Sequence, residues 1–326
     1  MRILILGTGA TGGYYGARLL AAGRDVTFLV RARNVQALAE RGLQVRSPQG
    51  DLSLPNPPTI QTQDIREPYD LILMSCKAYD MNAALDAIAP AMGPNTRIIP
   101  MLNGMSHMGA MDERFGAEHV LGGVCFISAV RDADGTIRHL NDLAEILFGD
   151  RTVPTSPLLE AIQTELSDAN FKATLRPDIE QRMWDKWAFL ATAAGITCLM
   201  RAPIGDIAAV DPTFAIRFHD ECTEIATAEG FPTSDHVRER ERARLSQPGS
   251  LFTASMLRDL EAGAPVESQQ ILRDLLEYGR KHKLATPLLE IAYTHVRCYE
   301  ERRRRSWLPD GRRLQKDSSG QQPTAD

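Results

Sequence analysis

The first half of the chain alternates short apolar runs with stretches of helical periodicity. Apolar runs of strand length cover residues 2–6, 25–30, 69–75, 96–101 and 120–128. Helical patterns lie between them, for example at residues 12–22 and 82–91. Because strands buried on both faces form unbroken apolar runs, this alternation predicts a parallel sheet covered by helices on both sides. We therefore expect a doubly wound α/β domain.

Another pattern, typical of antiparallel strands, overlaps the end of the fifth run. Extended runs at residues 126–130 and 136–140 flank Asp134-Gly135, a dipeptide that favours tight turns. A further short run lies at residues 146–149. We expect these strands to form an antiparallel extension at the edge of the sheet.

Beyond about residue 177 the strand pattern gives way to long helical periods. Residues 170–176 are expected to form the last strand. Six helical stretches follow at residues 178–194, 213–229, 234–244, 253–262, 267–282 and 287–304. The sequence thus predicts an α/β domain over residues 1–177 and an all-helical domain over residues 178–306. The remainder, residues 307–326, is rich in Gly, Ser, Gln and Asp and is expected to be disordered.

Composition fits a two-domain cytoplasmic protein. The 326 residues exceed what one core usually holds, and 43% hydrophobic with 24% charged residues is ordinary for globular proteins. A net charge of −5 gives no reason to expect a nucleic-acid partner, and the absence of an 18-residue apolar run argues against a membrane span. Scattered cysteines without a C-x-x-C pair predict reduced thiols, and the histidines lack metal-ligand spacing. The oligomeric state stays open, with a homodimer as one option.

A glycine-rich turn follows the first apolar run. Residues 7–12 spell GTGATG, which fits G-x-G-x-x-G between a strand and a helix. In this setting Gly7 permits a tight turn, Gly9 lets the backbone approach a pyrophosphate, and Gly12 lets the helix pack on the sheet. The helix N-terminus adds free N–H groups and partial positive charge. The turn predicts a Rossmann-type dinucleotide site; the alternative is a glycine turn without a ligand. The cofactor contacts assigned to it are Gly7, Thr8, Gly9, Ala10, Thr11 and Gly12.

The ends of the next strands carry further candidates. A carboxylate after the second strand would bind the ribose of NAD, but that position holds Arg31, followed by Arg33. A guanidinium suits a 2′-phosphate, which predicts NADP(H); the alternative is that both arginines are surface charges. Lys77 ends the third strand and Asn103-Gly104 the fourth. Lys77 and Asn103 are either cofactor contacts or, more simply, a surface lysine and a turn residue.

The order of motifs over most of residues 1–300 resembles the ketopantoate reductase (2-dehydropantoate 2-reductase) family. A lysine that enters an apolar helix, as Lys186 does, either extends to solvent or points into a cleft. The family resemblance favours the cleft. The motifs that carry it are GTGATGGYYGARL at the start, Arg31, SCKAY around Lys77, LNGM around Asn103, GTIRHL at residues 135–140, WDKW around Lys186, and Ser255-Met256-x-x-Asp259 with Glu267 twelve positions after the serine.

This resemblance implies NADPH-dependent reduction of a 2-keto acid to a 2-hydroxy acid, a step of pantothenate biosynthesis. Lys186 would be the general acid, and Glu267 would hydrogen-bond the substrate hydroxyls and hold the lysine. Ser255 would bind the substrate carboxylate, while Asn103 would contact the nicotinamide ribose or the substrate. The simpler alternatives are a helix-terminal charge for Glu267 and a first-turn serine for Ser255.

The chain departs from the family pattern where the substrate would bind. The family carries asparagines four and eight residues after the lysine and three before the serine. Here these positions hold Leu190, Ala194 and Phe252. A buried substrate hydroxyl without a partner would cost roughly 1–3 kcal/mol, which predicts a more apolar carbonyl substrate than ketopantoate. A non-catalytic NADP(H)-binding sensor and a 3-hydroxy-acid dehydrogenase of the 6-phosphogluconate type remain as alternatives.

Overall fold

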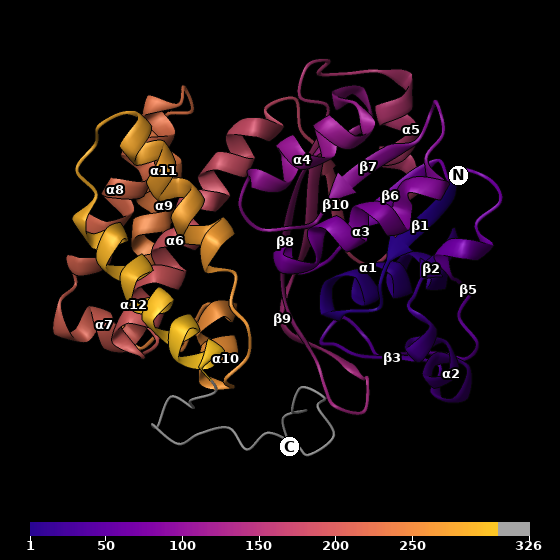
Figure 1. The fold of residues 1–326 in the computed structure, drawn as a ribbon, viewed down its shortest axis with the longest axis horizontal. Helices are drawn as coiled ribbons and strands as arrows, with labels where there is room; N and C mark the ends of the chain where they lie inside the picture. The colour runs from indigo at the N-terminus through magenta and orange to yellow at the C-terminus, as the bar shows by residue number, and fades with distance from the viewer. Residues whose placement is uncertain (306–326) are drawn as a thin grey trace. The chain divides into compact units, whose positions relative to one another are not determined.

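The computed structural model describes residues 1–305 (Figure 1), and the predicted disordered tail, residues 307–326, lies outside them. The chain divides into two compact units, Met1–Met183 and a second that starts at Trp184. The division falls inside α6 (Ile179–Met200), shortly after the predicted boundary at residue 177, which stays a prediction. Each unit is described by itself.

The first unit contains a five-stranded parallel sheet in the order β5-β2-β1-β6-β7. Its strands are β1 (Arg2–Leu6), β2 (Asp25–Leu29), β5 (Thr59–Ile60), β6 (Leu71–Met74) and β7 (Arg97–Pro100). The chain builds outward from β1 in one direction and then returns to add β6 and β7 on its other side. Such a reversal opens a crevice at the carboxyl ends of the central strands. The doubly wound fold is confirmed.

Alternate side chains of β1 belong to different cores. Ile3 and Ile5 pack in a cluster with residues of α1 (Ala10–Ala21) and α5 (Pro157–Leu166). Leu4 and Leu6 pack in a second cluster with residues of α3 (Met81–Ile88) and α4 (Ser106–Phe115). Because side chains alternate across a strand, an unbroken apolar run is what a sheet covered on both faces requires.

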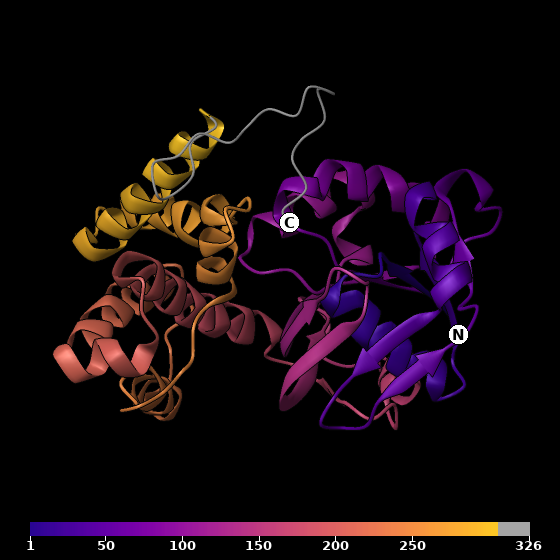
Figure 2. The same ribbon diagram turned by 90° about the horizontal axis from the view of Figure 1, so that it is seen from below.

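A second sheet corrects the predicted edge extension. It runs β10-β9-β3-β4, and β8 pairs antiparallel with β9 (Figure 2). The expected hairpin forms, and Gly135 takes a positive φ of +89° in its turn. The hairpin belongs to this separate sheet. An isolated bridge pairs Val120, just before β8, with Ile98 on β7. The strands are β3 (Leu43–Arg46), β4 (Leu52–Leu54), β8 (Gly122–Arg131), β9 (Ile137–Gly149) and β10 (Lys172–Leu175).

One strand, β9, replaces the two predicted at residues 136–140 and 146–149. The pairing register jumps from Ile127–Ala144 to Ala129–His139, so residues 140–143 bulge away from β8. Leu140 and Leu143 in this bulge are exposed. The irregular segment interrupts the apolar alternation, which is why the pattern suggested two strands.

The second unit is all-helical in its described part, as predicted. Besides most of α6 it holds α7 (Ile204–Val210), α8 (Phe214–Ala228), α9 (Asp235–Leu245), α10 (Ser255–Glu261), the π-helix Gln269–Arg273, α11 (Asp274–Lys281) and α12 (Pro287–Arg304). Close packing joins α6 to α8, because a Cβ added at Gly195 would lie 2.4 Å from the Phe218 ring. No single helix within residues 1–305 is long and apolar enough to cross a membrane; α6 and α7 meet that length and composition only as a pair bent by 72°.

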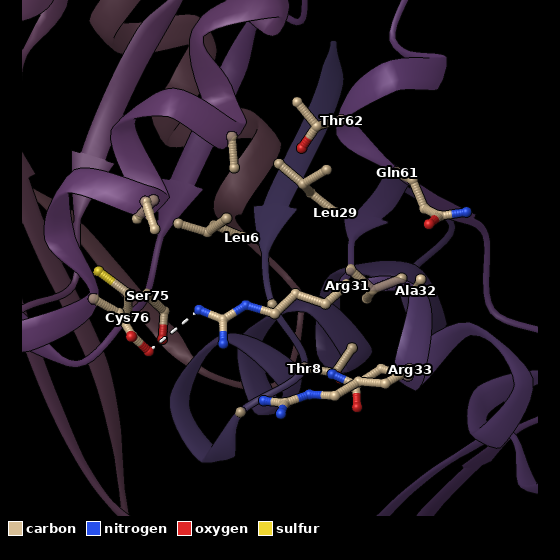
Figure 3. Close-up of a pocket in the computed structure, with 18 of the residues that line it drawn as sticks. Leu6, Thr8, Leu29, Arg31, Ala32, Arg33, Gln61, Thr62, Ser75 and Cys76 are labelled. Carbon is tan, nitrogen blue, oxygen red and sulfur yellow. Dashed lines mark ion pairs between the residues drawn. The ribbon is translucent and has the colours of Figure 1, made fainter. Parts of the chain in front are cut away.

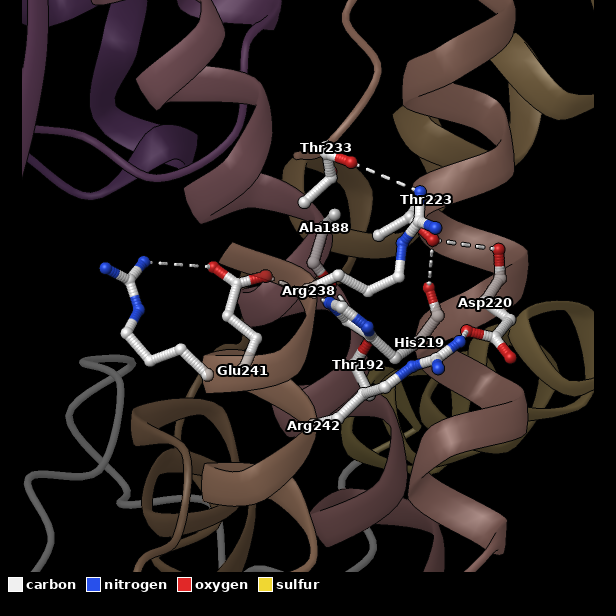
Figure 4. A network of polar contacts seen from close by, with 10 residues as sticks. Ala188, Thr192, His219, Asp220, Thr223, Thr233, Arg238, Glu241 and Arg242 are labelled. Carbon is white, nitrogen blue, oxygen red and sulfur yellow. Dashed lines mark hydrogen bonds and ion pairs between the residues drawn. The ribbon is translucent and has the colours of Figure 1, made fainter. Parts of the chain in front are cut away.

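A buried polar pair links α8 and α9 (Figure 4). His219 is fully buried, and its Nε2 lies 3.0 Å from Glu241 Oε2. Thr223 donates to the His219 carbonyl oxygen at 3.0 Å. Removing one partner from a buried pair of this kind is strongly destabilising, so these groups fix how α8 and α9 pack.

Candidate functional site

The glycine turn has the backbone geometry that the sequence predicted. Gly7 takes a positive φ of +81°, and its N–H donates to the Leu29 carbonyl at 2.9 Å. A Cβ added at Gly9 would meet nothing within 4 Å, so open space lies above the turn. A Cβ at Gly12 would come within 3.1 Å of Ser75 Cβ. The three glycines therefore serve a left-handed turn, an open approach and close packing against β6, respectively.

A cavity of about 490 Å³ lies beside this turn, at the carboxyl ends of the central strands (Figure 3). The turn contributes Gly7, Thr8 and Gly9 to its wall, and the segment after β2 contributes Arg31 and Arg33. The remaining lining comes from the ends of β1, β2 and β6, from residues 61–63, from α3 and from Arg131 on β8. The structure thus brings together the two sequence signals that predicted a dinucleotide.

The polar groups around the cavity fit a phosphorylated ligand. α1 begins at Ala10 with Gly9 as its N-cap, so the cap residue has no side chain to accept from the first turn, where Ser75 Oγ accepts from the Gly12 N–H. The first N–H groups of such a helix need an acceptor, and an anion provides one. Thr8 is almost fully buried, and its Oγ1 has no hydrogen-bond partner within residues 1–305. A helix start without an N-cap side chain and an orphaned hydroxyl at the same turn fit a pyrophosphate site.

Several predicted cofactor residues lie outside the lining of this cavity. Ala10, Thr11 and Gly12 form the first turn of α1, and the Gly12 N–H donates to Ser75 Oγ at 3.2 Å. Lys77 is half-buried just beyond the end of β6, and Asn103 is half-buried just beyond β7. Both therefore occupy carboxyl ends of central strands, where the fold places ligands, without lining this cavity.

An acidic residue in the cavity, Asp80, was not predicted from the sequence. Asp80 Oδ2 lies 3.3 Å from Arg31 Nη2, and both residues line the cavity. Arg33 lies on the same wall and forms no ion pair within the described chain. The signal available was the position of Asp80 just after a central strand. Its distance of 49 positions from Arg31 hid the pairing.

Lys186 and Glu267 both belong to the helical unit. Lys186 lies on α6 and is half-buried, while the nearby Trp184 and Trp187 of the same helix are buried. Glu267 is 7% exposed and comes just before the helical turn that leads into the π-helix. The Trp187 indole N–H donates to the Ile271 carbonyl at 3.0 Å, and the Ile271 N–H donates to the Glu267 carbonyl at 3.1 Å. These two bonds connect the helix of Lys186 to the segment of Glu267.

Ser255, the third candidate of this unit, begins α10 and is exposed. Ala254 is the N-cap residue, so Ser255 does not cap the helix. The hydroxyl therefore lies at a helix start and open to solvent within its own unit.

Two family models match the chain. The model described as "Ketopantoate reductase PanE/ApbA" matches residues 3–152, and the one described as "Ketopantoate reductase PanE/ApbA C terminal" matches residues 178–300. The chain belongs to the ketopantoate reductase family. The predicted resemblance is confirmed, and the chain is an oxidoreductase of the ketopantoate reductase type.

Known members of the family align along nearly their whole length. The chain is 31% identical to "Uncharacterized oxidoreductase YkpB" of Bacillus subtilis, covering 92% of this chain and 99% of that protein. It is 26% identical to a 2-dehydropantoate 2-reductase of Mesorhizobium japonicum, covering 91% and 97%. The crystal structure of a 2-dehydropantoate 2-reductase from Geobacter metallireducens matches with a TM-score of 0.84 at 29% identity, covering 91% and 99%.

The three positions that depart from the family pattern hold apolar side chains, which differ in exposure. Ala194 is 2% exposed within α6, and Leu190 lies one turn before it, half-buried. Phe252 is 40% exposed, with its ring centroid 6.4 Å from that of Phe189. Where the family offers amide groups, this chain offers a buried methyl group, a leucine and an aromatic pair.

Proposed function

We propose that this protein reduces a 2-keto acid to a 2-hydroxy acid with NADPH, as a 2-dehydropantoate 2-reductase does. The observation that carries the proposal is the cavity that holds the glycine turn and Arg31 together. Membership of the ketopantoate reductase family supports the reaction class.

In this proposal the first unit holds the cofactor. The turn at Gly7, Thr8 and Gly9 and the first turn of α1 would hold the pyrophosphate, because the start of a helix presents N–H groups and partial positive charge to an anion. Arg31 binds the 2′-phosphate through charge-assisted hydrogen bonds. Lys77 and Asn103 are assigned to the ribose and nicotinamide side, at the ends of the neighbouring strands. The bound cofactor supplies a hydride to C2 of the substrate.

The helical unit supplies the proton. As C2 becomes tetrahedral, its carbonyl oxygen gains negative charge, and the Lys186 ammonium stabilises that charge and donates a proton to the oxygen. The lysine is then reprotonated from solvent. Glu267 accepts hydrogen bonds from substrate hydroxyls and orients the lysine, while Ser255 and Asn103 bind the substrate. The carbonyl thereby becomes a hydroxyl, with one hydride and one proton added.

A substrate more apolar than ketopantoate is the second candidate. Leu190, Ala194 and Phe252 provide no amide partner for a 4-hydroxyl, and an unpaired buried hydroxyl costs roughly 1–3 kcal/mol. With ketopantoate as substrate, the protein would act in pantothenate biosynthesis. With another 2-keto acid it would be a family member of changed specificity.

The decisive experiment follows NADPH absorbance with a panel of 2-keto acids, including ketopantoate and analogues that lack its 4-hydroxyl. Turnover of any panel member supports the reductase, and a higher kcat/KM for the analogues supports the apolar substrate. Binding of NADPH without turnover of any acid would instead favour a non-catalytic NADP(H) sensor.

A further inference from the structure

Asp80 occupies a helix-capping position without capping the helix. It ends the 3₁₀ turn Ala78–Asp80 and is the N-cap residue of α3. An aspartate there usually accepts a hydrogen bond from the backbone of the first helical turn, but the Asp80 side chain makes none. Its carboxylate lies against Arg31 instead. The requirements of α3 therefore do not account for where this side chain points.

Arg31 and Asp80 form an ion pair in the wall of the cavity beside the glycine turn. Arg31 follows β2 and Asp80 comes after β6, so the two strands flanking β1 supply one group each. The side chains are 58% and 41% exposed, so a ligand can reach both. A pair this exposed adds little to folding stability, and its charges remain available to a ligand.

The two groups favour different forms of an adenosine ribose. A guanidinium binds a 2′-phosphate, whereas a carboxylate accepts hydrogen bonds from free ribose hydroxyls and repels a phosphate dianion. Among the residues that line the cavity, all within the described chain, Asp80 alone is acidic. It thus supplies the carboxylate that the end of β2 lacks.

We propose that Asp80 sets the cofactor preference of this site, so that the protein binds NADH as well as NADPH. Its carboxylate would accept hydrogen bonds from the free ribose hydroxyls of NADH and would repel the 2′-phosphate of NADPH at Arg31. This inference rests on the proposed function, because it requires a nicotinamide dinucleotide whose adenosine ribose lies beside Arg31.

The test is Asp80→Asn, which removes the charge with little change in shape and keeps a residue suited to an N-cap. Dissociation constants for NADPH and NADH are measured by fluorescence titration of the purified protein. We expect NADPH to bind roughly 3–10-fold more tightly and NADH roughly 3-fold more weakly. The gain for NADPH should shrink as salt is raised, because the repulsion is screened.

Asp86→Asn is the matched control. Asp86 lies on the same helix and pairs with Arg114 at 3.2 Å, but it does not line the cavity. Both dissociation constants should stay unchanged in this variant. The proposal is overturned if Asp80→Asn leaves the NADPH-to-NADH affinity ratio unchanged, or if it weakens NADPH binding. A native protein that binds neither nucleotide would overturn the proposed function, and this inference with it.

Discussion

The two units specify their candidate residues in different ways. In the first, the predicted residues meet backbone requirements, as the positive φ of Gly7 and the close packing of Gly12 illustrate. In the second, Lys186 and Glu267 are side chains on helical segments, and two hydrogen bonds through Ile271 link those segments. A site specified by backbone geometry leaves a motif in the sequence. A site assembled from side chains is recognisable only by comparison with a family, and its specificity can change without trace in the fold.

The largest expected effect tests whether the helical unit serves catalysis while the first unit serves cofactor binding. Lys186→Ala should lower kcat by roughly 10²–10⁴, because the proposed general acid is lost. The NADPH dissociation constant should change little, since the cavity belongs to the first unit. Steady-state kinetics and fluorescence titration measure the two quantities. Lys281→Ala, which removes an exposed lysine paired with Glu229, is the control. Unchanged turnover in Lys186→Ala would remove the acid role.

A change at the glycine turn should instead act on the affinity for NADPH. Gly9→Ala places a methyl group in open space, so the unfolding temperature should hardly change. The methyl group would obstruct a pyrophosphate, and NADPH affinity should fall by roughly tenfold or more, about 1.4 kcal/mol. Gly109→Ala also adds a Cβ where nothing lies within 4 Å, and serves as the control for added bulk. Equal NADPH affinity in both variants would contradict a close approach at Gly9.

Arg31→Ala should discriminate between cofactors. A charge-assisted hydrogen bond is worth about 1.5–3 kcal/mol, so NADPH binding should weaken by roughly 10–100-fold. NADH binding should change much less, because it lacks the phosphate. Arg114→Ala, an exposed arginine paired with Asp86 outside the cavity, is the reference. Equal losses for NADPH and NADH would mean that the guanidinium does not contact the 2′-phosphate.

Restoring an amide in the helical unit tests whether this unit sets the substrate specificity. Leu190→Asn should raise kcat/KM for ketopantoate relative to an analogue without the 4-hydroxyl, by roughly 3–10-fold, because the hydroxyl regains a partner. Leu190 is half-buried and suits the change better than the buried Ala194. An unaltered ratio of the two substrates would place the 4-hydroxyl elsewhere.

The smallest effect concerns the start of α6, the helix that contains the division between the units. Arg176 and Arg182 lower the pKa of Asp178 from 3.8 to about 2. The carboxylate therefore stabilises the fold above pH 3.8, and this contribution is lost as the pH falls through about 2. Asp178→Asn should lower the free energy of unfolding at pH 7 by less than about 1 kcal/mol, because the pair is partly exposed.

Chemical denaturation from neutral to acidic pH measures this effect. The difference between Asp178→Asn and the native protein should vanish at low pH, where both are uncharged at this position. Asp235→Asn, which affects a longer and more exposed pair with Arg238, is the comparison. If the difference persists at low pH, the lost stability would come from hydrogen bonds that the amide cannot replace rather than from the lost charge.

The elements predicted from the sequence are those with a long and regular pattern of apolar residues. The strands β1, β2, β6 and β7 lie within one or two residues of their predicted ends, and α12 has the predicted bounds. The short strands β3, β4 and β5 were missed, because two to four residues show no usable alternation. The helix α2 (Ala32–Arg41) was missed because Leu38 is its one buried residue, which leaves little apolar stripe to detect.

The candidate site was predictable in part for a related reason. The glycines and Arg31 are close in sequence to the strands that position them, so the motif and its strand and helix context were enough to predict that they lie together. The ion pair with Asp80 and the bond from Trp187 to Ile271 join positions that are distant in sequence. The π-helix inside the predicted stretch 267–282 leaves no periodic signature that separates it from an ordinary helix.

The strand β1 serves two cores at once and delivers the chain directly into the glycine turn. Deleting Ile5 would either exchange the faces of Ile3 and Leu4 or displace Gly7 by one position, depending on which side of the deletion keeps its place. The packing of both cores and the position of the proposed cofactor turn therefore depend on one strand register.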